Sequence, residues 1–179
     1  MLNVTDRPDL RSRRLILRRP HKKDADTIQA LANDWEVAKR LARVPYPYTL
    51  EDALFFLDEI VPKELVWIVQ NSESREMVGV AGLTPHKDAE SLELGYWLGR
   101  EFWGHGFATE AAKVVLDYAF SAPSTSVVTA GCFTDNFRSF RVLRKLGFQI
   151  TGESLRLCLA ERRELPHHDM ALTRELRAK

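Results

Sequence analysis

Two glycines one residue apart separate a strand pattern from a helix pattern in the middle of the chain. They stand in "EFWGHGFAT", where Gly104 and Gly106 flank His105 and an apolar run of helical period follows. A helix N-terminus carries unpaired backbone N–H groups and a partial positive charge, so it binds phosphates readily. Glycines allow a sharp turn and a close backbone approach to such a ligand. Taken alone, the loop indicates either a pyrophosphate site or a simple tight turn.

The loop differs from two well-known nucleotide-binding loops. No Gly-Lys-Ser/Thr follows it, so it is not a Walker loop. Gly104 and Gly106 match a dinucleotide fingerprint, but Thr109 stands at the third glycine position, and no acidic residue near position 128 could bind a ribose. These departures disfavour a plain nucleotide-binding module.

A second segment, "TDNFRSFRVLRKLGF", could act beside this loop. Its helical pattern places Asn136 and Ser139 on one face, since they are three residues apart, and it is the most basic helix expected in the chain. In the strand before the loop, Gly95 and Gly99 indicate a bulge or a close backbone approach. A bulge there would leave backbone groups free for an extended ligand that carries amides.

The two segments together resemble a known family. "ELGYWLGREFWGHGFATEAA" is similar to the acetyl-CoA signature of the GNAT superfamily of N-acetyltransferases, and "NFRSFRVLRKLGF" is similar to its second signature. The resemblance covers nearly the whole chain, and "RRLILRR" is similar to the family's first strand. Within the superfamily, the chain resembles the ribosomal-protein alanine N-acetyltransferase (Rim) type. It implies acetyl-CoA as the cosubstrate.

The resemblance also implies which residues bind acetyl-CoA. The superfamily pattern begins with Gln or Arg, and here Trp103 takes that place, so a polar side-chain contact to phosphate is not expected from it. The backbone from Gly104 to Thr109 is implied to hold the pyrophosphate. The implied binding residues are Tyr96, Trp97 and Leu98 along the pantetheine arm, Trp103, Gly104, His105, Gly106, Phe107, Ala108 and Thr109 at the pyrophosphate, and Asn136 on the other side of the arm.

Acetyl transfer by direct attack on the thioester needs a deprotonated amine, and the departing thiolate can take up a proton. A thiol of pKa about 8.5 leaves with little help, and an α-amine of pKa about 7.7–8.0 loses its proton more easily than a lysine at about 10.4. Glu93 lies near the place where the superfamily often has a basic carboxylate, and the alternatives are a bound water or a solvent-facing Glu. Ser139 matches the hydroxyl proposed as the acid in Rim-type enzymes, and Tyr96 is a substitute acid.

Other reactive side chains are less promising. A solvated loop position is expected for His105 rather than a phosphate contact. His167 and His168 are adjacent, so they point to opposite sides of a predicted strand, and no further ligand stands at a suitable spacing for zinc. Cys132 is expected to be a small buried apolar residue rather than a nucleophile. No metal cofactor is therefore predicted.

The elements that must position these residues alternate along the chain. Periodicity predicts strands at 13–19, 64–70, 77–85, 92–99 and 126–133 and two more after 147, and helices at 22–34, 50–60, from 108 to 119, and at 136–146. Thr49 and Asp52 predict a helix N-cap, and Gly147 followed by Phe148 predicts a helix end. This order predicts one α/β (α+β) domain spanning residues 1–179 around a mixed sheet. The resemblance implies the GNAT form, mostly antiparallel and flanked by helices.

Composition narrows the class of protein. The chain has 179 residues and a formal net charge of +1, which disfavours a general nucleic-acid or membrane binder. No apolar run approaches the roughly 18 residues that span a bilayer. The two cysteines are far apart in sequence and form no CxxC motif. A reduced, cytoplasmic protein is expected.

The sequence leaves the acceptor open. The Rim-type resemblance implies the α-amine of a protein N-terminus, and the alternatives are a small-molecule amine or a non-catalytic sensor that binds acyl-CoA. Residues 35–56 and 160–168 are expected to line the acceptor cleft, and neither segment has the strongly acidic surface that a polyamine requires. Nothing in the chain decides whether it forms a homodimer.

Overall fold

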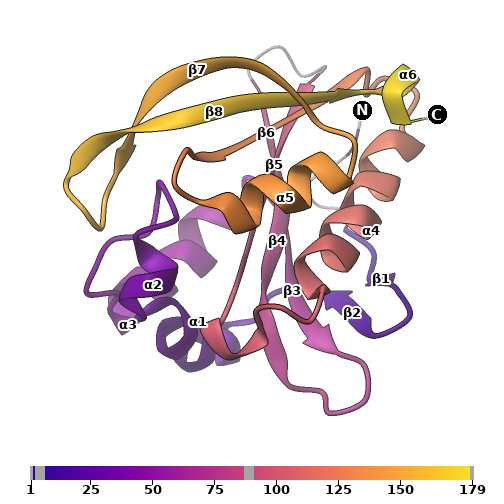
Figure 1. Cartoon of the computed structure of the whole chain (residues 1–179). Coiled ribbons are helices and arrows are strands. Elements are labelled where there is room, and N and C mark those ends of the chain that lie inside the picture. Colours follow the sequence, from indigo (N-terminus) through magenta and orange to yellow (C-terminus); the bar gives the residue numbers. More distant parts are fainter. Residues whose placement is uncertain (1, 3–6, 87–90, 178–179) are drawn as a thin grey trace.

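A mixed sheet with helices on both faces forms the body of the protein (Figure 1). The computed structural model describes residues 2, 7–86 and 91–177. Within these residues the sheet has eight strands in the order β1-β2-β3-β4-β5-β6-β8-β7, and neighbouring strands are antiparallel except for the parallel pair β5 and β6. The strands are β1 (Leu10–Arg11), β2 (Leu15–Arg18), β3 (Leu65–Asn71), β4 (Met77–Pro85), β5 (Ser91–Leu98), β6 (Val127–Phe133), β7 (Gln149–Cys158) and β8 (Arg163–Thr173). The predicted α/β (α+β) fold with a mostly antiparallel sheet is confirmed.

Helices lie on opposite sides of the central strands β4 and β5 (Figure 1). Those on one side are α1 (Ala25–Ala32), α2 (Trp35–Ala38) and α3 (Leu50–Phe55), and the π-helical turn η2 (Phe56–Ile60) continues α3. The other side holds α4 (Phe107–Ser121) and α5 (Phe137–Lys145). The short helix α6 (Arg174–Arg177) follows β8, and two 3₁₀ turns are η1 (Lys22–Asp24) and η3 (Arg100–Phe102). In the described part of the chain, no helix is long and apolar enough to cross a membrane.

Two helix ends form as their sequences predict. At the start of α3, the Thr49 hydroxyl accepts from the Asp52 N–H and the Asp52 carboxylate accepts from the Thr49 N–H, which is a reciprocal capping box. After α5, Gly147 has φ +95°, and the N–H of Phe148 donates to the carbonyl of Leu143 at 3.1 Å. Both caps depend on neighbouring residues alone, so the local sequence was sufficient to predict them.

The predicted elements differ from the structure at short segments. The two-residue β1 and the four-residue α2 were not predicted, because neither is long enough to show a period. The first predicted strand is shorter than expected, since β2 covers only Leu15–Arg18. The turn expected at 86–91 lies mostly outside the described residues.

Strand β5 divides the molecule into two cores. Leu94, Tyr96 and Leu98 pack with α4 and α5, whereas Trp97 packs against the core under α1 and α3. Because side chains alternate along a strand, Glu93 lies on the same face as Trp97. This alternation places the candidate acids and the candidate base on opposite faces of the sheet.

Candidate active site

Strands β5 and β6 diverge in the middle of the sheet. Their pairing runs from Ser91 to Glu93 opposite Val127 to Thr129, while β5 remains paired with β4 as far as Leu98. The other edge of β5 beyond Glu93 is therefore free to pair with an extended ligand. Of the two alternatives given for Gly95, the bulge is wrong, because the β4–β5 register is continuous there. The divergence of β5 and β6 exposes the backbone instead.

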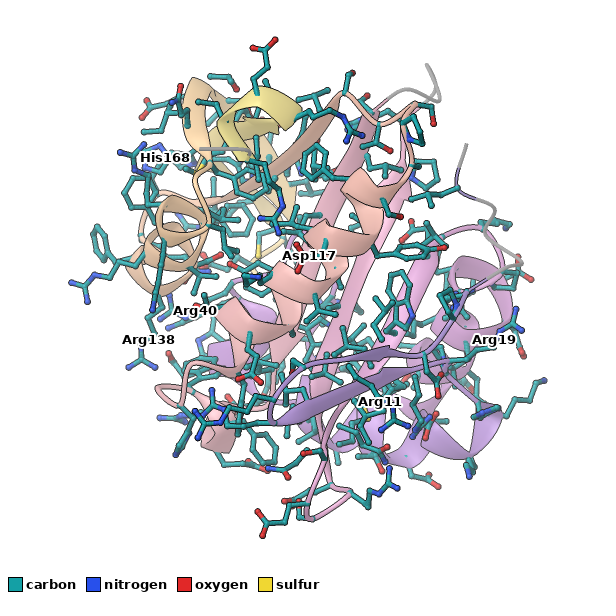
Figure 2. The ribbon with its side chains drawn as sticks, turned by 90° about the vertical axis from the view of Figure 1, so that its right-hand side faces the viewer. Arg11, Arg19, Arg40, Asp117, Arg138 and His168 are labelled. Carbon is teal, nitrogen blue, oxygen red and sulfur yellow. The ribbon has the colours of Figure 1, made fainter. Side chains whose placement is uncertain are left out.

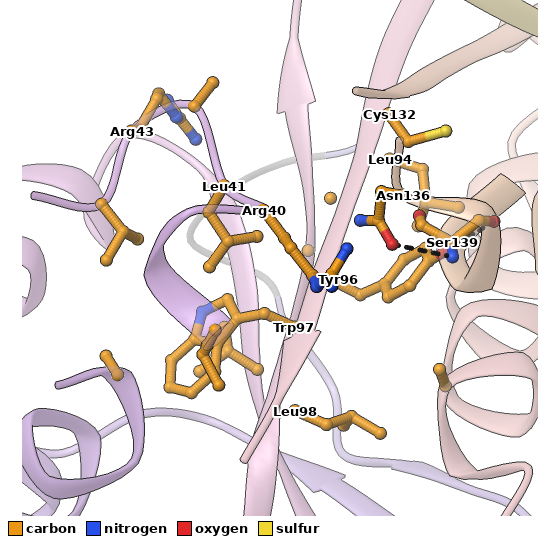
Figure 3. A pocket seen from close by; sticks show the side chains of 18 of the residues that line it. Arg40, Leu41, Arg43, Leu94, Tyr96, Trp97, Leu98, Cys132, Asn136 and Ser139 are labelled. Atoms are coloured by element: carbon orange, nitrogen blue, oxygen red, sulfur yellow. Dashed lines mark hydrogen bonds between the residues drawn. The ribbon is translucent and has the colours of Figure 1, made fainter. Parts of the chain in front are cut away.

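A cavity of about 1090 Å³ opens at this divergence. Figure 3 shows its centre, with Arg40 and Leu41 on one side of β5 and Asn136 and Ser139 on the other. Residues from the predicted acceptor segment 35–56 line it. From 160–168 only His167 is among the lining residues, because the walls near the hairpin come instead from β7 and from Leu159.

The glycine loop closes one end of the cavity. Gly104 and Gly106 have φ of +83° and +80°, a backbone conformation that other residues adopt only with strain. The backbone N–H groups of residues 104–109 have no acceptor among the described residues. Arg14 holds the loop from behind, since it donates to the carbonyl of His105 at 3.0 Å and to the carboxylate of Glu110 at 2.8 Å. The six free donors at the start of a 15-residue helix fit a pyrophosphate.

The indole ring of Trp103, which lines the cavity, packs against two arginine side chains. Its indole N–H donates to the carbonyl of Leu98 at 3.0 Å, which fixes the ring. The guanidinium groups of Arg138 and Arg40 lie 5.0 Å and 5.9 Å from the ring centre, and Figure 2 shows these two side chains close together. The Nε of Arg40 is buried and has no acceptor among the described residues. The stacked arginines thus supply the cationic groups that Trp103 itself lacks.

Tyr96 and Ser139, the two candidate acids, are in contact. The Tyr96 and Ser139 hydroxyl oxygens lie 2.9 Å apart, and Asn136 at the N-cap of α5 accepts from the Ser139 N–H at 3.3 Å (Figure 3). Burial raises the pKa of Tyr96 well above its usual value, although the hydrogen bond from Ser139 opposes this. The phenol therefore stays protonated and can donate a proton or a hydrogen bond.

Glu93 lies apart from these hydroxyls, on the opposite face of β5. Its carboxylate accepts from Arg156 of β7 at 2.7 Å, and both side chains are partly exposed. The structure therefore places Glu93 in the cavity wall but gives it a fixed partner.

The remaining reactive residues lie as follows. His105 is exposed and stacks on Phe107, with ring centres 5.8 Å apart. Cys132 is buried, and burial raises the pKa of its thiol to about 11, which keeps it protonated. His167, which the sequence marked only as a doubtful zinc ligand, is buried in the cavity wall beside Asp169. No cluster of three or more potential metal-binding side chains occurs among the described residues.

Sequence patterns missed four residues of the site. They are Arg14, Arg40, Arg156 and His167, and each reaches the site from an element distant in sequence. Arg40 and His167 lay within the two segments, 35–56 and 160–168, that were expected to line the acceptor cleft.

The fold and the site define an N-acetyltransferase. The free edge of β5 leads to the start of α4, and the two hydroxyls lie between them in one cavity. A family model for the acetyltransferase (GNAT) domain matches residues 14–149, and the chain belongs to this family. The resemblance inferred from the two signatures is confirmed.

Known proteins share both sequence and fold with the chain. An uncharacterised N-acetyltransferase of Bacillus subtilis, YoaA, is 33% identical over 153 residues, which are 81% of this chain and 85% of the relative. The ribosomal-protein-S5-alanine acetyltransferase of Vibrio fischeri has a similar fold, with a TM-score of 0.78 at 20% identity over 93% of this chain and 96% of that one. The spermidine N-acetyltransferase of Vibrio cholerae, solved with CoA and spermine, has a TM-score of 0.78 at 18% identity over 94% and 100%.

Proposed function

We propose that the protein transfers the acetyl group of acetyl-CoA to the α-amine of a peptide or protein N-terminus. One observation carries the proposal: a single cavity joins the free edge of β5, the free N–H groups of residues 104–109 and the hydroxyls of Tyr96 and Ser139. An amide-bearing arm can pair with a strand edge, and a pyrophosphate can bind a helix N-terminus. Both parts border the same cavity, which fits a ligand that has both groups.

The residues present fit acetyl-CoA. The N–H groups of residues 104–109 would bind its pyrophosphate, with charge from Arg138 and Arg40. The free edge of β5 at Tyr96, Trp97 and Leu98 would pair with its pantetheine arm. Bound there, acetyl-CoA would supply the activated acetyl group as a thioester.

The charge of the cavity supports an α-amine rather than a polyamine. Three carboxylates line it within the described residues, and each is already engaged: Glu64 pairs with Arg43 at 2.8 Å, Glu93 pairs with Arg156 at 2.7 Å, and Asp52 caps α3. A polyamine carries several positive charges, and binding them here would need these partners to be displaced. An acceptor with a single amine meets no such cost.

Apolar side chains form the rest of the acceptor wall. They come from the segment that follows α2 and runs through α3 and η2, and they comprise Leu41, Val44, Pro45, Phe55, Phe56 and Ile60. Such a surface suits the first side chains of a peptide, since burial of apolar area favours binding. The peptide main chain can leave the cavity through its open side.

The hydroxyls of Tyr96 and Ser139 would act at the leaving sulfur. Tyr96 is protonated at neutral pH and its hydroxyl is hydrogen-bonded to that of Ser139, so either hydroxyl can donate a proton to the thiolate, and the pair then regains a proton from solvent. Starting from its ammonium form, the acceptor nitrogen loses two protons during the reaction. One balances the thiolate, and the other passes to solvent through a base.

A free-thiol release assay over N-terminal peptides, amino acids, spermidine and drug-like amines tests the proposal. We expect turnover with apolar N-terminal peptides at a kcat/KM at least tenfold above that for spermidine. Thermal shift with acetyl-CoA and ATP is the binding control, because a ligand at a hundred times Kd stabilises the fold by about 2.7 kcal/mol. Stabilisation by acetyl-CoA without turnover of any amine would indicate an acyl-CoA sensor, and preferred turnover of spermidine would indicate a small-molecule enzyme.

A further inference from the structure

A buried histidine faces the point where β5 and β6 diverge. His167 lies on β8 opposite Phe133 of β6, is only 4% exposed, and lines the cavity. A Cβ added to Gly131 would collide with the Cε1 of His167 and would lie 2.7 Å from its Nε2. The Cε1–Nε2 edge of the ring therefore covers Gly131. This residue is two positions beyond Thr129, the last β6 residue that pairs with β5.

Asp169 sets the orientation of this ring. The Nδ1 of His167 lies 2.9 Å from the Asp169 carboxylate, which also accepts from the Ser154 hydroxyl at 3.0 Å. An ionised carboxylate is an acceptor only, so Nδ1 carries the proton and Nε2 has the free lone pair. No described residue is hydrogen-bonded to Nε2. The ring thus presents a proton acceptor to the cavity.

The surroundings keep His167 neutral. Burial lowers its pKa below the usual value of about 6.5 and outweighs the hydrogen bond with Asp169 of β8, which raises it. Arg156 of β7 lowers the pKa further, and the charge of Glu93 on β5 raises it slightly. At neutral pH the ring is therefore uncharged and ready to accept a proton. Glu93 differs, because its carboxylate already accepts from Arg156.

We propose that His167 is the base that deprotonates the acceptor amine, with Asp169 as its positioning residue. The inference rests on the proposed function and names a residue that acts in it. The Nε2 lone pair takes one N–H proton of the amine as the amine lone pair forms the C–N bond and the C–S bond breaks. The thiolate is protonated from the Tyr96 and Ser139 hydroxyls, His167 releases its proton to solvent, and the hydroxyl pair regains one proton from solvent, so the catalyst is restored. In this mechanism Glu93, which is paired with Arg156, lines the acceptor site and takes no proton.

The neighbouring histidine offers a matched control. His168 follows His167 on the same strand but points to the other face, where its ring centre lies 5.2 Å from that of Phe140 on α5 (Figure 2). His168→Gln therefore makes the same chemical change outside the acceptor side of the cavity. We expect His167→Gln to lower kcat at pH 7 by a factor on the order of 10² to 10⁴. Acetyl-CoA affinity by calorimetry should change less than about twofold in both variants, and His168→Gln should keep wild-type kcat.

The pH profile separates a base from a structural residue. In the wild type, kcat at saturating acceptor should fall on the acid side with a midpoint below about 6.5. In His167→Gln that limb should disappear, and the rate should rise about tenfold per pH unit up to the pKa of the acceptor itself. Asp169→Asn should lower kcat while the acetyl-CoA affinity stays the same, because it changes the tautomer and not the binding of acetyl-CoA.

A measurement on the wild type covers the case in which His167→Gln does not fold. Nitrogen-15 NMR of labelled histidine should show the ring protonated on Nδ1 and neutral at pH 7, with a titration midpoint below about 6.5. Protonation on Nε2 at neutral pH, or a midpoint above 7, would overturn the proposal.

Two kinetic outcomes distinguish the failures. If His167→Gln turned over at the wild-type rate, this inference would be overturned and the proposed function would stand. The same would follow if Glu93→Gln lost turnover while His167→Gln kept it. No turnover by the wild type with any amine would overturn the proposed function, and this inference with it.

Discussion

The Tyr96 hydroxyl lies 2.9 Å from the Ser139 hydroxyl, although the two residues come from β5 and α5. The contact joins both candidate acids into one pair, so they are not alternatives at separate places. Burial raises the pKa of Tyr96, and the pair remains protonated over the working pH range. Its effect should appear in turnover rather than in binding.

Ser139→Ala should therefore lower kcat by about tenfold to a hundredfold and leave acetyl-CoA affinity nearly unchanged. The loss is modest because a thiolate leaves easily. Tyr96→Phe should act similarly, and the double variant should lose less than the product of the two losses, since the hydroxyls act as a unit. Steady-state kinetics with calorimetry measures both quantities. Full activity in both single variants would remove the pair from the mechanism.

Asn136 has a structural role as well as its implied contact with the pantetheine arm. Its side chain caps α5, so Asn136→Ala should cost about 1 kcal/mol of stability and should also raise the Kd for acetyl-CoA. Asn136→Ser keeps a capping oxygen but loses the amide. We expect thermal denaturation to show restored stability in the Ser variant, with the acetyl-CoA affinity still reduced. Recovery of both would mean that the cap alone positions the site.

Gly106→Val should lower acetyl-CoA affinity at least tenfold, about 1.4 kcal/mol. The reason is the backbone, because φ is +80° at Gly106 and the nearest side-chain atom to an added Cβ, on Arg14, is at an ordinary 3.5 Å. A β-branched residue would force the chain out of this conformation and turn the N–H groups away from the pyrophosphate. Gly152→Val on β7, where an added Cβ meets nothing within 4 Å, is the control and should bind normally by calorimetry. Normal binding by a folded Gly106→Val would show that the glycine serves only the turn.

Arg138→Gln should weaken acetyl-CoA binding by about tenfold, since its guanidinium over Trp103 supplies charge at the mouth of the cavity. The difference from the wild type should shrink at high salt, because partly exposed charges are screened. Arg11→Gln on β1 removes the same charge far from the cavity and should leave Kd unchanged (Figure 2). Equal losses in both variants would point to net charge rather than to a local contact.

The ion pair between Arg18 and Asp24 should control acid stability. Burial alone would raise the pKa of Asp24, but the hydrogen bonds from Arg18 and the His21 N–H outweigh it and hold the pKa below its usual value. The pair therefore stabilises the fold above about pH 3.9, and this stability is lost as pH falls through the lowered pKa. Asp24→Asn should cost about 3 kcal/mol at pH 7 by chemical denaturation. Asp58→Asn, which breaks the exposed pair with Lys22, should cost less than about 1 kcal/mol. Equal costs would show that burial of the Arg18–Asp24 pair is unimportant.

Local sequence determined the elements and their ends. The strands other than β1, the helices α1, α3, α4 and α5, and the caps at Thr49 and Gly147 follow from periodicity and from contacts within a few residues. The glycine loop before α4 and the pair Asn136 and Ser139 at the start of α5 were found in the same way, because each signature is continuous in sequence. The capping role of Asn136 was not predicted. These local features were enough to identify the family.

Only the tertiary structure decided which side chains meet at the site. The free edge of β5 depends on where β6 diverges, and the pairs Glu93–Arg156 and Tyr96–Ser139 join distant strands and helices. Such contacts are set by register and by which face each residue occupies, and a shift of one position would reverse them. The same alternation that placed His167 and His168 on opposite faces put one of them beside Asp169 in the cavity and the other against α5.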